Sequence, residues 1–242
     1  MDKLLTTRKE RFRAPEVAAR DDFIRRHAAT LPQDSWVLDA GAGASKYRPL
    51  FFHCRYQTQD FCQYQGSAVQ YLEPIDYVCD ITRIPLPDGS LDAIVCTEVF
   101  EHVVNPMAVL AEFSRLLKPG GRLFLTAPML SHLHMAPYHF YAGFTHYWYR
   151  HWLPLSGLEI DELIAVGGPG RSCAVFAESF YVAWKGKEEK LSPAQKWLSK
   201  CVRMLFKLPV HYLLPLTLPR LDRWIGNDLV CSSYLVSATK GP

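Results

Sequence analysis

The sequence predicts an α/β fold with an open, doubly wound and mostly parallel sheet that has helices on both faces. Short apolar segments typical of buried strands alternate with helical segments and tight turns, which is the pattern of parallel β-α-β units. A glycine-rich turn follows the first of these strands, and an acidic residue ends each of the first three. Ligands of such sheets bind beyond the carboxyl ends of the strands, so these features also indicate where a site would lie.

The predicted elements follow one another regularly up to residue 128. Residues 15–31 are expected to form a helix with Pro15 in its first turn. Asn105 and Pro106 are typical of a helix start, and the apolar residues after them recur at helical spacing until a Gly-Gly pair. The predicted strands are 36–39, 55–59, 77–79, 91–96 and 122–126, followed by strand candidates at 158–166 and 229–238.

Composition favours a soluble globular protein. Hydrophobic residues make up 49% of the 242 residues and charged residues 21%, which suits one α/β domain with a sizeable core. The net charge of +3 is spread along the chain, so we expect no nucleic-acid partner. The seven cysteines form no CxxC pair, and the charged N-terminus has no apolar core of a secretory signal. We therefore predict a cytoplasmic protein without a disulfide framework.

The loop after the first strand and the acids after later strands indicate a nucleoside ligand. Gly41 and Gly43 leave the backbone free to approach a ligand, and a helix after them is expected to direct N–H groups at it. Asp60 is placed to accept hydrogen bonds from ribose hydroxyls, and Asp80 to reach an adenine amino group beside Ile81. The dinucleotide fingerprint would need a glycine where Lys46 stands, which disfavours NAD.

Three segments together resemble the type 11 branch of the class I methyltransferases: VLDAGAG, CDITRIPLPDGSLDAIVCTEVFEHV and LLKPGGRLFLTAP. The resemblance implies S-adenosylmethionine as cofactor and a seven-stranded sheet with an antiparallel last strand. By this resemblance, Asp39, Gly41 and Gly43 surround the methionine part of the cofactor. Asp60 binds its ribose, Asp80 and Ile81 its adenine, and Thr97 lies near the sulfonium.

We interpret residues 1–242 as a single methyltransferase domain. It comprises an N-terminal helical extension (1–35), a cofactor-binding half (36–128) and a substrate-side half (129–242) with a helical insertion at about 170–226. The predicted activity is methyl transfer to oxygen or nitrogen of a small-molecule or lipid-linked metabolite. The alternative is a methyltransferase-like binding protein or partner subunit without activity.

Glu98, Glu101 and His102 would share one face of a helical turn, and three interpretations stay open for them. Glu101 and His102 could brace the loop through hydrogen bonds, which is favoured. His102 could be a general base. All three could hold a divalent metal, which is the least favoured, so no metal is predicted.

The segment 129–156 is rich in histidine and aromatic residues and is expected to cover a substrate pocket. Within it, His134 and His139 are the candidates for a substrate-side base.

The segment 194–224 is basic and apolar. Residues 196–207 have the pattern of a basic amphipathic helix. The segment 208–224 contains Pro209, Pro215 and Pro219, so we expect that it does not form one membrane-spanning helix. A helical insertion packed on the sheet is favoured, and a peripheral membrane anchor is the alternative.

Overall fold

The computed structural model describes residues 14–67, 69–187, 191–227 and 229–242. The chain divides into two compact units. The first unit comprises residues 1–164 and 233–242, and the second unit comprises Ala165–Ser232. The predicted insertion at about 170–226 lies within the second unit.

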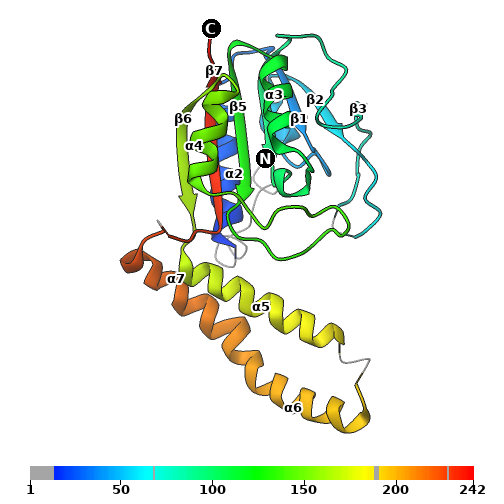
Figure 1. The fold of residues 1–242 in the computed structure, drawn as a ribbon, viewed down its shortest axis with the longest axis vertical. Coiled ribbons are helices and arrows are strands. Elements are labelled where there is room, and N and C mark those ends of the chain that lie inside the picture. Colours follow the sequence, from blue (N-terminus) through cyan, green and yellow to red (C-terminus); the bar gives the residue numbers. More distant parts are fainter. Residues whose placement is uncertain (1–13, 68, 188–190, 228) are drawn as a thin grey trace. The chain divides into compact units, whose positions relative to one another are not determined.

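The first unit is built on one seven-stranded sheet in the order β3-β2-β1-β4-β5-β7-β6 (Figure 1). The pairs β1–β2, β1–β4, β2–β3 and β4–β5 are parallel, whereas β7 runs antiparallel to β5. The strands are β1 (Trp36–Ala40), β2 (Arg55–Asp60), β3 (Tyr77–Val78), β4 (Leu91–Thr97), β5 (Leu117–Pro128), β6 (Leu158–Val166) and β7 (Ser233–Lys240). The predicted fold class is therefore confirmed, including the antiparallel last strand.

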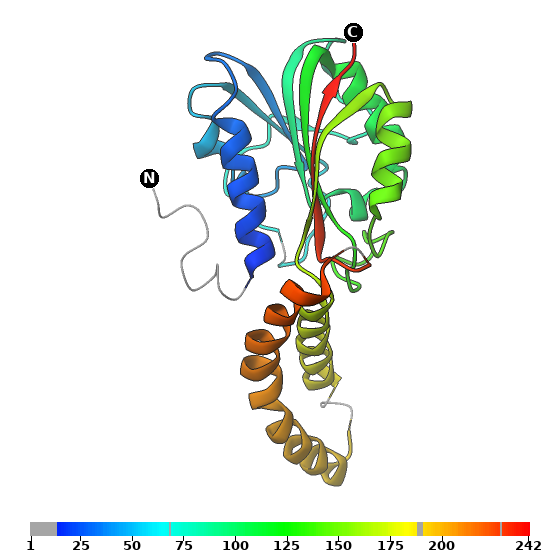
Figure 2. The same cartoon turned by 90° about the vertical axis from the view of Figure 1, so that its left-hand side faces the viewer.

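Helices cover both faces of this sheet. Helix α2 (Pro15–Ala28) lies on one face, and α3 (Pro106–Leu116) and α4 (His146–Leu155) lie on the other (Figure 2). Asn105 caps α3 as predicted, because its side chain accepts a hydrogen bond from the Ala108 N–H. The central strands β4 and β5 are buried on both faces and form the core, which explains why they read as continuous apolar runs.

The glycine-rich loop differs from its prediction. No α-helix begins directly after Gly43, where every residue is described; the chain instead makes turns as far as Tyr47 and then a short 3-10 helix, η1 (Arg48–Phe51). The expectation that a helix would direct its N–H groups at a ligand is therefore wrong. Pro49 and the positive φ of 52° at Ser45 fit this irregular path better than an uninterrupted helix.

The second unit is helical. It contains α5 (Pro169–Lys187), α6 (Pro193–Leu208), the π-helical segment η4 (Pro209–Leu213) and α7 (Leu214–Ile225). Helices α5 and α7 pack closely: the Asp222 carboxylate of α7 accepts hydrogen bonds from the Gly170 and Arg171 N–H groups at 2.7 and 3.0 Å. These bonds satisfy N–H groups at the start of α5, which an α-helix leaves unpaired.

The prediction that three prolines interrupt this segment is wrong. Residues Pro193–Ile225 form a continuous helix of 33 residues, long and apolar enough to cross a membrane by length and composition. A π turn at Pro209 accommodates the missing N–H, with the Leu214 N–H donating to the Pro209 carbonyl. The Thr217 hydroxyl donates to the Leu213 carbonyl at 2.7 Å. Proline therefore costs backbone hydrogen bonds here without ending the helix.

Candidate active site

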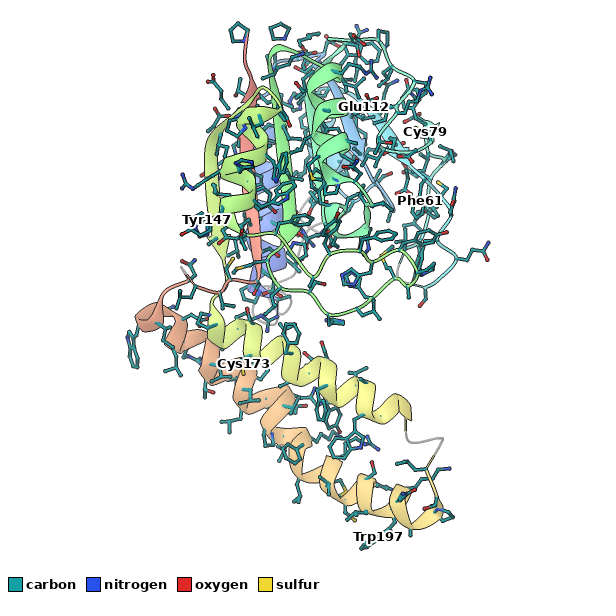
Figure 3. All side chains as sticks on the ribbon, in the orientation of Figure 1. Phe61, Cys79, Glu112, Tyr147, Cys173 and Trp197 are labelled. Carbon is teal, nitrogen blue, oxygen red and sulfur yellow. The ribbon has the colours of Figure 1, made fainter. Side chains whose placement is uncertain are left out.

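A cavity of about 590 Å³ opens at the carboxyl ends of β1 to β4, within the usual size range of small-molecule sites. Phe61 and Cys79, at the ends of β2 and β3, mark its position in Figure 3. Its lining comprises Gly41, Gly43, Gln59, Asp60, Phe61, Gln63, Val69, Tyr71, Val78, Cys79, Asp80, Ile81, Thr82, Glu98, Val99, His102, Val103, Val104, Asn105, Met135, Tyr138 and Phe140. Five of the seven predicted cofactor-binding residues are among them.

The two glycines of the loop have left-handed backbone conformations, with φ of +73° at Gly41 and +51° at Gly43. The Gly41 N–H donates to the Gln59 carbonyl at 2.8 Å, and the Gly43 N–H donates to Asp60 Oδ2 at 3.0 Å. A Cβ on Gly41 would lie 2.4 Å from a methyl carbon of Val99, which also lines the cavity. The loop therefore requires glycine at this position for both conformation and space.

Asp60 and Asp80 are held at the cavity by short-range hydrogen bonds. Asp60 is buried and also accepts from the Cys62 N–H and the Tyr71 hydroxyl, both at 3.0 Å. Exposed Asp80 accepts from the N–H and hydroxyl of Thr82 at 2.8 and 2.7 Å. These contacts hold both carboxylates at the cavity that the buried, apolar Ile81 also lines.

Asp39 and Thr97 are not among the residues that line this cavity in the described part of the chain. The Asp39 carboxyl is buried and accepts a hydrogen bond from the Tyr56 hydroxyl. Burial, together with the nearby Asp60 carboxylate, raises the pKa of Asp39 to about 6. Thr97 is half-buried at the end of β4. Their predicted contacts with the methionine part and the sulfonium stay predictions.

Glu98 does not share a helical turn with Glu101 and His102, which corrects the predicted arrangement. It has a φ of +55° and precedes the 3-10 turn η2 (Phe100–His102). Its carboxylate accepts from the Thr126 hydroxyl at 2.9 Å and pairs with Arg20 of α2 at 3.3 Å. Glu98 still lines the cavity, but its carboxylate is held by α2 and β5.

His102 faces the cavity with a defined tautomer. Its Nδ1 lies 2.5 Å from the Tyr138 carbonyl oxygen, so Nδ1–H donates and the lone pair is on Nε2. Burial and the positive charge of neighbouring histidines lower the pKa of His102. The Glu101 carbonyl accepts from the Phe140 N–H at 2.8 Å. These bonds connect η2 to the loop after β5, as the bracing interpretation requires, and they leave the His102 Nε2 lone pair unused.

His134 and His139 lie beside His102 rather than in the cavity lining. The His134 ring centroid is 4.7 Å from that of His102 and 4.7 Å from that of His139. The Glu101 carboxyl, 2% exposed, lies next to this group, with Oε1 3.8 Å from His102 Nε2. Burial and the neighbouring Glu98 raise the pKa of Glu101 to about 8. We call His102, His134 and His139 the histidine group.

Sequence reasoning missed two residues that support the site. The Gln59 side chain accepts from the Gly41 N–H at 3.2 Å and donates to the Cys79 carbonyl at 2.7 Å, which connects β1 to the end of β3. The sequence could have indicated Gln59, because this polar residue directly precedes Asp60 in a predicted strand. Arg20 offered none, because only the tertiary fold brings α2 to Glu98.

Known proteins share both the sequence and the fold of this region. Residues 38–125 match a family model described as a methyltransferase domain. A ubiquinone biosynthesis O-methyltransferase from Xanthomonas oryzae pv. oryzae is 55% identical over 38 residues. That match covers 16% of this chain and 16% of the relative, so it spans about one sixth of the relative's length.

Solved structures extend the likeness to most of the fold. A putative sarcosine dimethylglycine methyltransferase from Galdieria sulphuraria has a TM-score of 0.54 at 16% identity, covering 94% of this chain and 88% of that one. A phosphoethanolamine N-methyltransferase 2 from Haemonchus contortus, solved with S-adenosyl-L-methionine, has a TM-score of 0.52 at 14% identity. It covers 93% of this chain and 52% of the other.

Sheet order, the acid-lined cavity at the strand ends and the glycine loop define a class I, Rossmann-like methyltransferase fold. Residues 38–125 are similar to the type 11 methyltransferase domain, and the chain shares the fold of solved methyltransferases. The cysteines form no disulfide in the described part of the chain.

Proposed function

We propose that this chain transfers a methyl group from S-adenosylmethionine to oxygen or nitrogen of a small-molecule or lipid-linked acceptor. The cavity carries this proposal, because it brings five predicted cofactor residues to the same space as His102. When bound there, the cofactor supplies an activated methyl on a positively charged sulfur. Asp60, Asp80 and Glu98 add acidic side chains to the lining, which suits a cationic ligand.

The cavity residues fit this cofactor. The absent Cβ at Gly41 leaves space that a side chain would take from Val99 and the ligand. Asp60 accepts three hydrogen bonds among the described residues, and a carboxylate offers about four acceptor positions. One position therefore remains for a ribose hydroxyl, and a second becomes free if the Tyr71 hydroxyl moves away. Apolar Ile81, with Val78 and Phe61 in the same lining, suits the flat face of an adenine.

The histidine group supports activation of the acceptor. The acceptor's lone pair forms the bond to the methyl carbon while the bond to sulfur breaks, and the acceptor's proton must leave. His102 Nε2 carries a lone pair at the cavity, and His139 Nε2 is buried without a hydrogen-bond partner among the described residues. Either nitrogen is suited to accept that proton.

Calorimetry with S-adenosylhomocysteine tests cofactor binding. We expect saturable binding by the full chain and a marked loss in Asp60→Ala and Asp80→Ala. Absence of binding at about millimolar ligand, an affinity limit of about 4 kcal/mol, would overturn the proposal. Binding without methyl transfer to any acceptor in a broad screen would favour the alternative of an inactive partner subunit.

A second assay tests the histidine group. We expect His139→Ala to lower turnover while S-adenosylhomocysteine binding stays intact, because His139 lies outside the cavity lining. His151→Ala is the matched control, since His151 is exposed on α4. Unchanged turnover in His139→Ala would remove His139 from the proposal.

We further propose that the second unit binds an anionic membrane surface. Residues 165–232 contain ten Lys and Arg but five Asp and Glu, while the whole chain has a net charge of only +3. Large apolar side chains of α6 are exposed beside these charges, including Trp197 (Figure 3), Leu205 and Phe206. An exposed apolar stripe flanked by basic residues is typical of helices that lie in the membrane interface. A lipid-linked acceptor would then be concentrated near the enzyme.

Co-sedimentation with phosphatidylserine-containing vesicles at low salt tests membrane binding. We expect the wild-type chain to sediment, and Lys200→Glu combined with Lys207→Glu to reduce this, because both side chains lie on the exposed α6. Trp197→Ala should weaken binding at high salt as well, since its contribution is apolar. A wild-type chain that stays in the supernatant would end the proposal of membrane binding. The cytoplasmic location of the protein stays a prediction.

A further inference from the structure

Glu101, His102 and His134 bring one ligand atom each to within 4.8 Å of one another. We propose that these three side chains bind a divalent first-row transition-metal ion. Two imidazoles and one carboxylate suit zinc, iron, cobalt or nickel, whereas magnesium and calcium prefer oxygen ligands alone. The three side chains come from two separate segments, η2 and the loop after β5, which only the fold brings together.

Both histidines are oriented as metal ligands are. His102 Nδ1 lies 2.5 Å from the Tyr138 carbonyl, and His134 Nδ1 lies 2.9 Å from the His132 carbonyl. Each Nδ1–H therefore donates to a backbone carbonyl, and each Nε2 carries a lone pair. Metal-ligating histidines are commonly held in this way, because the second hydrogen bond fixes both the tautomer and the ring orientation.

The carboxyl of Glu101 supplies the second, independent observation. It is 2% exposed, and its Oε2 has no hydrogen-bond partner among the described residues. A buried oxygen without a partner is rare in folded proteins because it loses its hydration without compensation. A cation between Glu101 and the two Nε2 atoms would neutralise this carboxylate and give the oxygen a ligand.

Direct hydrogen bonding does not explain the cluster equally well. Glu101 Oε1 lies 3.8 Å from His102 Nε2, which is beyond hydrogen-bond distance. Tetrahedral ligands bonded at about 2.1 Å lie roughly 3.4 Å apart, so the cluster needs to contract by about an ångström. His134 is on a loop outside helices and strands, and the carbonyl that holds its Nδ1 belongs to the same loop, so the loop and the ring can shift together toward Glu101.

Glu98 has no place in this site, which separates it from the triad considered from the sequence. Arg20 and Thr126 hold the Glu98 carboxylate at 3.3 and 2.9 Å. A bound ion would border the cavity, because His102 also lines it. If the proposed methyl transfer is correct, the ion would coordinate an acceptor oxygen and promote loss of its proton to His139 or water. This last step rests on the proposed function, whereas cation binding does not.

Cobalt(II) is the probe for this site, because its visible absorption reports coordination. The full chain is treated with a chelator, dialysed and titrated with Co²⁺, and then with Zn²⁺ as a competitor. We expect saturation at one ion per chain, displacement by Zn²⁺, and at least a tenfold weaker affinity in Glu101→Gln and in His134→Ala. His151→Ala should retain the wild-type affinity.

Failure of the site and failure of the enzyme are distinguishable. Each variant is also titrated with S-adenosylhomocysteine, which reports the folded cavity independently of the metal. Wild-type Co²⁺ binding that is absent, or that is unaffected in His134→Ala, overturns the inference even if the cofactor binds. Co²⁺ binding that requires Glu101 and His134 supports it even if no methyl acceptor is found.

Discussion

Substituting Gly41 with alanine tests whether the loop requires glycine for both backbone conformation and space. A residue with a Cβ costs about 1–2 kcal/mol in the left-handed region, where Gly41 has a φ of +73°. The new Cβ would also lie 2.4 and 2.9 Å from the two methyl carbons of Val99. Overpacking of this kind costs about 1–3 kcal/mol. We therefore expect Gly41→Ala to lower the free energy of unfolding by about 2–5 kcal/mol.

Two matched variants separate these contributions. Gly120 has a φ of +77°, and a Cβ added there would meet nothing within 4 Å, so Gly120→Ala should lose only the conformational part, about 1–2 kcal/mol. Val99→Ala removes the methyl groups that would clash with the new Cβ. In the double variant, Gly41→Ala should therefore add only its conformational cost to the loss of stability that Val99→Ala causes alone. Val99 lines the cavity, and its displacement should also weaken cofactor binding in the single variant.

Urea unfolding measures the first quantity and calorimetry with S-adenosylhomocysteine the second. The wild type, the two single variants at Gly41 and Val99 and the double variant form a double-mutant cycle whose coupling reports the contact between these residues. A cycle without coupling, or a Gly41→Ala chain as stable as Gly120→Ala, would refute the steric part of the reasoning. Unchanged affinity for the ligand in Gly41→Ala would refute the assignment of this loop to the cofactor.

Three further predictions concern charge and packing. Folding raises the pKa of Asp39 from 3.8 to about 6, so its ionisation destabilises the folded state as pH rises through this window. Above pH ~6, Asp39→Asn should have a free energy of unfolding roughly 3 kcal/mol higher than the wild type in urea unfolding. Near pH ~4 the two proteins should have similar free energies of unfolding. Burial raises the pKa of Glu112, but hydrogen bonds from Arg115 and the Ile84 N–H lower it by a larger amount, so the pKa of Glu112 lies below its usual value. Glu112→Gln should therefore be less stable than wild type at neutral pH, with the difference in urea unfolding shrinking as pH falls below the unfolded value of about 4.5. A Cβ on Gly170 would lie 2.2 Å from the Leu218 carbonyl oxygen, so Gly170→Ala should separate α5 from α7 and reduce vesicle binding while S-adenosylhomocysteine binding is retained.

The sheet and most of the acids and glycines that line the cavity were predictable because their signals are local. Each of β1, β2 and β3 ends within two residues of an acid, and parallel strands bring their carboxyl ends to one edge. Asp60 and Asp80 therefore line the same cavity although they belong to different strand ends. The sequence carried no comparable signal for the donors that hold Asp60, such as the Tyr71 hydroxyl, because that contact depends on a loop.

The arrangement of Glu98, Glu101 and His102 was not predictable from their spacing. Residues three and four apart share a face only in a continuous helix, and Glu98 has a positive φ that takes it out of one. Its carboxylate is then free to pair with Arg20 from α2, which lies far away in sequence. The place that Glu98 would have taken beside Glu101 and His102 is filled by His134 from another loop.

The helix Pro193–Ile225 shows the limit of proline as a sequence signal. Proline removes one N–H donor and clashes with the preceding turn, which is why it usually marks a helix end. Its φ nevertheless suits a helix, and the π turn at η4 widens the backbone where Pro209 enters. The cost that remains is the loss of the N–H donor to one carbonyl group in the turn before each proline.

Thr217 gives the membrane proposal a sharper test. Its side chain is exposed on α7, and its hydroxyl donates to the Leu213 carbonyl. Thr217→Val keeps the shape of the side chain and replaces the hydroxyl with an apolar methyl group. If this face enters lipid, the variant should bind vesicles more tightly than the wild type, because burying a hydroxyl costs more than burying a methyl group, and its stability in urea unfolding should change little. Equal vesicle binding by the variant and the wild type would argue against burial of this face in lipid.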